Sequence, residues 1–153
     1  MLSETSERNT AMSTDPTATW LKRAAVFVVL VGVVIALGAH PATAWPVLVL
    51  ADLTLWPLDG AQSLAAPETR LIYGIAGGMM AGWGVMIWLL VDRVWPRDPR
   101  TARHMILTAL FTWFVIDSVA SFAAGAPLNV VVNVAFLAIF LVPIMAGRKS
   151  EPA

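Results

Sequence analysis

The sequence predicts an all-α integral membrane protein, a four-helix bundle with a short interfacial or re-entrant segment between its first and second helices. Apolar residues make up 58% of its 153 residues and charged residues only 13%, against about 45–50% and about 25% in soluble domains. Four apolar segments each approach the roughly 20 residues that a bilayer core requires. Backbone groups in lipid must be hydrogen-bonded within the segment, so each segment is expected to be a helix.

The expected transmembrane domain covers residues 20–147. Its helices span about residues 21–40, 71–91, 105–124 and 128–146. Residues 1–19 are polar and rich in Ser and Thr, which is typical of a disordered tail, and residues 148–153 form a second short tail. Only Gly125, Ala126 and Pro127 separate the last two apolar segments. So short a link predicts an antiparallel helical hairpin.

The stretch between the first two expected spans is apolar but interrupted. Pro46, Asp52 and Pro57 break it into pieces that are too short to cross a bilayer. We expect an interfacial or re-entrant piece with Trp45 and Trp56 at headgroup level, because tryptophan favours that depth. A plain extramembrane loop is the alternative.

The positions of the basic residues predict the orientation. Nine of the ten basic residues precede the first span, lie between the second and third, or follow the fourth; they are Arg8, Lys22, Arg23, Arg93, Arg97, Arg100, Arg103, Arg148 and Lys149. Four spans place these three regions on one side of the membrane, and the positive-inside rule makes that side cytoplasmic. We therefore expect a multi-pass protein of a bacterial inner membrane with both termini in the cytoplasm.

The first apolar segment has a second interpretation. Lys22 and Arg23, the apolar run and then Ala42-Thr43-Ala44 resemble a signal peptide with a cleavage site before Trp45. Cleavage would leave three spans in an unchanged orientation. The leading tail is long and acidic for a signal peptide, so the four-span interpretation is preferred.

One acidic residue, Asp117, falls inside the third expected span. A carboxylate at that depth is costly unless it is paired, protonated or hydrated. The inferred topology gathers polar residues of three spans in the outer half of the bundle: Arg70, Tyr73, Asp117, Ser118, Ser121, Asn129 and Asn133.

Three interpretations of this set stay open, of which a contact with a partner subunit is the least favoured. In the first, it is a hydrogen-bonded structural contact, with Asp117 bound to Asn133 or to the Arg70 guanidinium. In the second, it lines an outward-facing polar pocket for a small molecule, a proton or an ion, with Asp117 as the charged group.

The second span carries glycines at a spacing of four residues. Gly74, Gly78 and Gly82 are expected on one face, where small residues let another helix of this chain or of another protein approach closely. A ligand lying against this face is a less favoured interpretation.

The remaining residues predict neither catalysis nor a cofactor. The chain has no cysteine, which excludes disulfides, iron–sulfur ligation and thiol catalysis. His40 and His104 are expected at opposite membrane faces and do not form a joint metal or haem site. The sequence also lacks the nucleotide-binding, metalloprotease and hydrolase motifs. We expect no metal, no catalytic residue and no binding of nucleic acid.

Residues 67–140 resemble a pattern of uncharacterised small membrane proteins of proteobacteria. The matching residues are Arg70, Gly77-Gly78, Gly82-Trp83-Gly84, Trp113-Phe114, Asp117-Ser118, Ser121, Gly125 and Asn129 to Asn133. The resemblance implies a bacterial inner-membrane protein and brings no known activity.

These features predict a non-enzymatic accessory or assembly subunit of a larger membrane complex, with the lipid bilayer, a membrane-protein partner or a second copy as its contacts. A small transporter or ligand-binding protein that uses the Asp117 pocket is the alternative.

Overall fold

The structure, a computed structural model, describes residues 15–148, and all regular structure in that range is helical. The elements follow in the order α2 (Pro16–Ala36), η1 (Leu37–Ala39), η2 (Pro41–Thr43), α3 (Trp45–Thr54), α4 (Pro67–Arg93), α5 (Pro99–Ala123) and α6 (Pro127–Arg148). Four of the helices are long and apolar enough to cross a membrane. The predicted all-α four-helix fold is confirmed, and the chain is a multi-pass membrane protein.

Local sequence signals explain where these helices begin and end. Asp15 caps α2 by accepting hydrogen bonds from the Thr17 and Ala18 N–H groups at 2.8 and 3.3 Å. A proline opens each of α4, α5 and α6, where its missing N–H costs no hydrogen bond. After α5, Gly125 turns the chain with a φ of +73°, a value that favours glycine. The tight α5–α6 hairpin that this link predicts is present.

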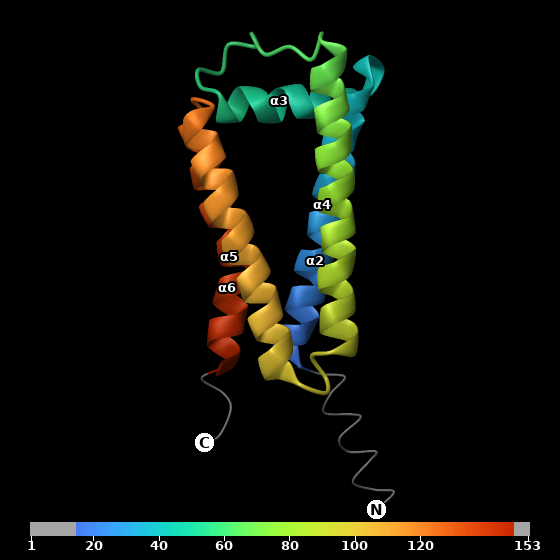
Figure 1. Cartoon of the computed structure of the whole chain (residues 1–153), viewed down its shortest axis with the longest axis vertical. Coiled ribbons are helices and arrows are strands. Elements are labelled where there is room, and N and C mark those ends of the chain that lie inside the picture. The colour runs from blue at the N-terminus through green and yellow to red at the C-terminus, as the bar shows by residue number, and fades with distance from the viewer. Residues whose placement is uncertain (1–14, 149–153) are drawn as a thin grey trace, which may run out of the picture.

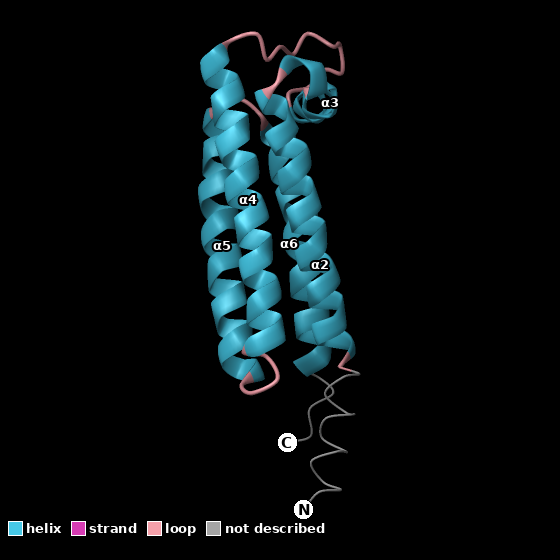
Figure 2. Cartoon of the chain, turned by 90° about the vertical axis from the view of Figure 1, so that its right-hand side faces the viewer, coloured by secondary structure: helices cyan, strands magenta, loops and turns pink. Residues whose placement is uncertain are grey.

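The four long helices form two antiparallel pairs. Helices α2 and α4 lie side by side, as do α5 and α6, and the pairs are nearer at the end where α2 begins and α6 ends (Figures 1 and 2). Toward the opposite end the pairs diverge, and α3 lies across that end, roughly perpendicular to the bundle (Figure 1). The α4–α5 link and both described chain ends are thus together, as the charge pattern requires.

The α2–α4 pair is held at close range by three glycines, which we call the α2–α4 seam: Gly32, Gly77 and Gly84. A Cβ on Gly77 would lie 2.3 Å from the Ala36 nitrogen and 2.5 Å from the Gly32 carbonyl oxygen. A Cβ on Gly84 would lie 2.9 Å from the Ala25 carbonyl oxygen. Only glycine at these positions permits the observed distance between the two backbones.

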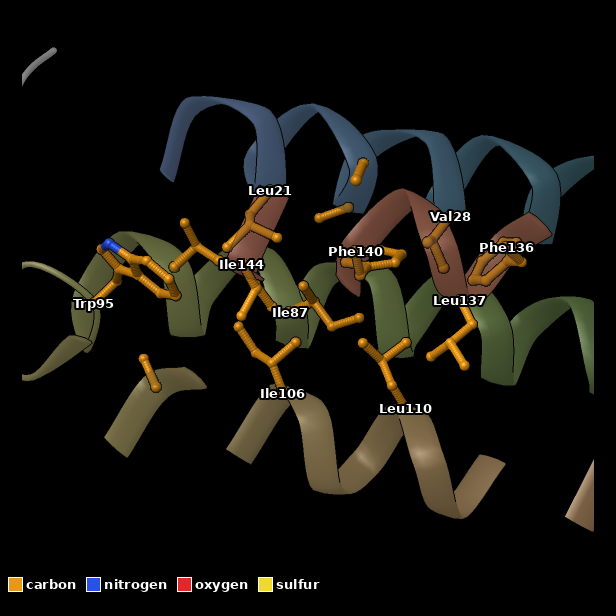
Figure 3. Packing of buried hydrophobic residues seen from close by; sticks show 14 residues of the cluster. Leu21, Val28, Ile87, Trp95, Ile106, Leu110, Phe136, Leu137, Phe140 and Ile144 are labelled. Atoms are coloured by element: carbon orange, nitrogen blue, oxygen red, sulfur yellow. The ribbon is translucent and has the colours of Figure 1, made fainter. Parts of the chain in front are cut away.

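Where the pairs are close, large apolar side chains fill the interior (Figure 3). Leu21, Ile106, Leu110, Phe140 and Ile144 are each no more than 1% exposed. They come from α2, α5 and α6 and meet Ile87 and Val91 of α4; all belong to one cluster. This dry core fixes the four helices relative to one another.

The interrupted segment between the first two spans contains a real helix. The ten residues of α3 extend about 15 Å, too short to cross a bilayer, and a separate small cluster of Ala44, Val47 and Leu64 anchors it to the bundle. Trp45 and Trp56 are 71% and 66% exposed. The predicted interfacial piece is therefore supported, and the alternative of a plain loop is wrong for residues 45–54.

Three of the helices begin well before their predicted first residues, and the α-helical part of the first span ends at Ala36 rather than near residue 40. The first span begins at Pro16 rather than at residue 21, so residues 15–19, predicted as part of a disordered tail, belong to a capped helix. Helices α4 and α5 begin earlier than predicted, at Pro67 and Pro99, because polar first turns continue the helix beyond the apolar run. The predicted tails over residues 1–14 and 149–153 lie outside the described residues.

Candidate functional site

Four polar side chains of the α5–α6 hairpin form one hydrogen-bonded group, which we call the polar cluster: Asp117, Ser121, Asn129 and Asn133. Asn133 donates from Nδ2 to Asp117 Oδ1 at 2.7 Å, and Asn129 donates to the same oxygen at 2.9 Å. Ser121 Oγ lies 3.1 Å from Oδ1 and 2.7 Å from the Asp117 backbone oxygen, and it accepts from Asn129 at 2.9 Å. All these bonds join α5 to α6 or stay within α5.

The cluster occupies positions that continue the apolar core. Ile106, Leu110, Asp117 and Ser121 share one face of α5, because they recur at intervals near the 3.6-residue helical period. Ile106 and Leu110 are at most 1% exposed, whereas Asp117 is only partly buried. The core thus becomes polar and more open toward the end where the two helix pairs diverge.

Two predicted members of the site lie elsewhere. Arg70 donates from Nη1 to the Leu64 carbonyl oxygen at 3.5 Å and forms no contact with Asp117. Tyr73 packs with Val47 and Leu64, against α3. The expectation that Arg70 and Tyr73 join the cluster is wrong, because the first turns of α4 face η1 and α3 rather than the α5–α6 hairpin. Ser118 is adjacent in sequence, but its hydroxyl is buried without a hydrogen bond.

Asp117 therefore has neutral neighbours. Two ion pairs are found within residues 15–148, Lys22–Asp92 at 2.8 Å and Arg93–Asp92 at 3.0 Å, and neither involves Asp117. Its partners are amide and hydroxyl donors, which stabilise a carboxylate by hydrogen bonding but bring no formal positive charge. Counted as a carboxylate, the cluster carries one uncompensated negative charge.

The predicted glycine face of α4 does not contact α2. A Cβ on Gly78 or Gly82 would meet no atom within 4 Å, and one on Gly74 would lie 3.3 Å from the Ala39 Cβ. The close approach uses Gly77 and Gly84 instead. These two glycines are seven positions apart, which is about two helical turns, so they lie on the same face of α4. Gly78 and Gly82 therefore do not form a packing face toward another helix of this chain.

Sequence reasoning also missed several contacts between elements. Trp113 of α5 lies beside Trp83 of α4 and Phe136 of α6, with ring centroids 5.7 and 5.2 Å away. Two tryptophans at the same depth in neighbouring spans were the only available signal. Lys22 bridges α2 to Asp92 of α4 at the other end of the bundle. The opposite charges of these residues, each at the same end of its span, hinted at this pair.

The groups at the polar cluster are those that bind a ligand through charge and hydrogen bonds. Within residues 15–148, no three His, Cys, Asp or Glu side chains gather to hold a metal ion. Among its hydrogen-bond partners in the described chain Asp117 has no second carboxylate, and the Ser121 hydroxyl that donates to its Oδ1 also donates to its backbone oxygen. A lone carboxylate with amide donors can hold a positive charge or a hydrogen-bond donor.

Comparison with protein-family models, with curated proteins and with solved structures finds no match for the chain. The resemblance over residues 67–140 to small proteobacterial membrane proteins thus stays a prediction.

Proposed function

We propose that the chain is a non-enzymatic subunit of a larger membrane complex in a bacterial inner membrane, with both termini in the cytoplasm. The orientation rests on the charge pattern. Lys22, Arg23 and the arginines between α4 and α5 are at one end of the bundle, and Arg70 is at the other. The positive-inside rule makes the first end cytoplasmic.

The observation that carries the subunit proposal is the contrast between two sets of glycines on α4. Gly77 and Gly84 are buried, and atoms of α2 occupy the space that a side chain would need there. Gly78 and Gly82 are exposed, and a Cβ at either position would meet no atom within 4 Å. In lipid, helix association depends on close packing at small residues. An exposed face of this kind therefore supports contact with a helix of another protein.

The polar cluster fits the same role. Its hydrogen bonds hold α5 to α6, so Asp117 and the two asparagines can act as a structural link. Helices and short links make up most of residues 15–148, so a separate catalytic domain has little room within that range. A subunit that acts by contact with another protein requires no catalytic domain.

Site-specific cross-linking in native membranes tests the proposal. The natural chain has no cysteine, so Gly78→Cys and Gly82→Cys each introduce a unique thiol on the exposed glycine face. We expect these thiols to cross-link the chain to one defined membrane protein, which mass spectrometry identifies. Met79→Cys is the matched control, because Met79 is 71% exposed at the same depth on another face of α4.

A second pair of variants tests the same face without a reagent. Gly78→Leu adds a bulky side chain into open space, so the isolated chain should keep its fold and lose the co-purifying partner. Met79→Leu should leave the partner bound. Equal cross-linking at positions 78 and 79, or a partner that survives Gly78→Leu, contradicts the subunit proposal.

One observation favours the second candidate function, a small transporter or ligand-binding protein that uses the polar cluster. All three side-chain donors approach Asp117 Oδ1, and Oδ2 accepts no hydrogen bond within the described chain. Half of the carboxylate is therefore open to a ligand. The cluster lies on the side of the bundle that the charge pattern makes outward-facing.

Reconstitution of the purified chain in liposomes separates the two functions. A carrier should move its substrate without any other protein, and Asp117→Asn should abolish that activity while the amide preserves hydrogen bonding to α6. A subunit should be inactive alone. Retention of every binding or transport activity by Asp117→Asn eliminates the carrier function.

A further inference from the structure

We propose that the polar cluster binds one alkali-metal cation, held at the open side of the Asp117 carboxylate. The inference goes beyond the proposed subunit role, because an ion can occupy this position whether or not the chain has a protein partner. It rests on the charge, the acceptor oxygens and the exposure of the cluster.

The charge of Asp117 favours a bound cation. Asp117 lies in a membrane-spanning helix, where an unpaired carboxylate is unfavourable. Within residues 15–148, Arg70 is the one Arg or Lys at this end of the bundle, and it is directed at the Leu64 carbonyl instead. Three neutral donors reduce the cost of the charge but do not cancel it. One monovalent cation makes the cluster neutral, whereas a divalent ion would leave a net positive charge in an apolar surrounding.

Several oxygen atoms of the polar cluster accept no hydrogen bond from the described residues. Asn129 and Asn133 both turn Nδ2 toward Asp117, so the carbonyl oxygen of each amide accepts no hydrogen bond within residues 15–148. Asp117 Oδ2 accepts none from the described residues either, because the side-chain donors all approach Oδ1. Carboxylate, carbonyl and hydroxyl oxygens are the ligands that hard cations prefer. A proton needs one oxygen, and this group offers several.

Asp117 is accessible from one end of the bundle. Asp117 lies six residues before Ala123, the last residue of α5, which is about 9 Å along the helix axis. Its partners are held firmly, because Asn133 and Ser121 are only 3% and 6% exposed, whereas Asp117 itself is partly exposed. An ion can therefore reach the carboxylate from the end of the bundle that α3 crosses, against a preformed set of amides.

Thermal unfolding of the purified full-length chain in a mild detergent tests the proposal. NaCl or KCl replaces choline chloride at constant ionic strength and constant pH, and tryptophan fluorescence reports the unfolding midpoint. A ligand that binds only the folded state raises the midpoint. We expect a rise of roughly 3–6 °C at a tenfold excess over the dissociation constant, and no rise for Asp117→Asn.

Asp52→Asn is the matched control, because Asp52 is another partly buried carboxylate at the same end of the bundle. It accepts only from the Gly60 N–H at 3.1 Å, so its variant should keep the full response to the cation. Equilibrium dialysis of the unmodified chain with ²²Na⁺ provides a measurement that needs no variant, and we expect one bound ion per chain.

Three outcomes overturn the proposal. The first is the same midpoint in sodium, potassium and choline salts together with no bound ²²Na⁺. The second is a rise that Asp117→Asn retains, which indicates a general salt effect. The third comes from repeating the series at a lower pH: a midpoint that changes with pH but not with the cation shows that a proton, and not a metal ion, neutralises Asp117. None of these outcomes changes the cross-linking expected at Gly78, so the subunit proposal is tested separately.

Discussion

Gly32 and Gly77 face each other across α2 and α4 so closely that neither position has room for a methyl group. A Cβ on Gly32 would lie 2.8 Å from the Gly77 carbonyl oxygen, and one on Gly77 would lie 2.5 Å from that of Gly32. The obstructing atoms belong to the backbone, which cannot rotate away as a side chain can. This reciprocal contact explains why α2, although it comes first in the chain, is bound tightly to the bundle.

Gly77→Ala should therefore separate α2 from α4 and destabilise the fold. Overpacking a tight interface costs about 1–3 kcal/mol, and we expect a lower unfolding midpoint of the purified chain in detergent. Gly78→Ala is the control one residue away, where a Cβ meets no neighbour; its midpoint should be unchanged or slightly raised, since alanine favours the helix. Equal losses for the two variants would show that the seam is misassigned.

The hydrogen bond from Asn133 to Asp117 should stabilise the α5–α6 hairpin by a modest amount. Asn133→Leu keeps the size of a side chain that is 3% exposed but removes the 2.7 Å bond. Hydrogen bonds between transmembrane helices are worth about 0.6 kcal/mol on average and up to about 1.7 kcal/mol. We expect a loss in that range in reversible unfolding in detergent.

Thr112→Val is the matched control for that loss. Its hydroxyl donates to the Thr108 carbonyl oxygen of the same helix at 2.8 Å, so the bond does not link two helices. The variant should unfold at nearly the wild-type midpoint. If Asn133→Leu does the same, the polar cluster does not hold α5 to α6, and a binding role for the cluster gains support.

The sequence predicted every membrane-spanning helix, but it did not predict which faces of those helices contact one another. Apolar length predicts helices such as α4 and α6 because the bilayer sets the required length. It cannot say which face of α4 meets α2, since glycines recur on several faces of that helix. The choice of Gly77 and Gly84 depends on their register with Gly32, which is a tertiary fact.

The same limit applies to the candidate site. Asp117, Ser121, Asn129 and Asn133 were predicted to meet because a three-residue link forces α5 and α6 to be neighbours at equal depth. Arg70 was assigned to them on depth alone. Depth fixes the position along the bundle axis and leaves the direction around it undetermined, and in the structure Arg70 turns toward Leu64.

Asp98 should make the start of α5 sensitive to acid. Hydrogen bonds from the Thr101 hydroxyl at 2.6 Å and the Thr101 N–H at 3.0 Å hold the pKa of Asp98 below its ordinary value. Because the folded pKa is the lower one, the stabilisation is fully present above the ordinary pKa. It is lost as the pH falls through the lowered value.

Unfolding midpoints measured from neutral pH down to pH 3 test this cap. Asp98→Ala should unfold below the wild type at neutral pH, and the gap should narrow in acid as the wild-type carboxylate is protonated. Asp98→Asn keeps a side-chain oxygen for the cap, so its difference from the wild type at neutral pH should be smaller. A gap for Asp98→Ala that is constant over the whole pH range would exclude the carboxylate as its cause.

The contacts of α2 lead to a prediction about the mature protein. Signal-peptide cleavage before Trp45 would remove the whole of α2, including Gly32, and would leave Gly77 and Gly84 without the helix that fills them. It would also remove Leu21 and Val28 from the core, both fully buried. We therefore expect the chain purified from its native membrane to retain residues 15–44 when its intact mass is measured. A mass that corresponds to a start at Trp45 would eliminate the four-span protein and would require another helix to occupy the seam. Separately expressed residues 45–153 provide the second arm: without α2 they should unfold at a lower temperature than the full chain, since the seam and part of the core are then open to detergent.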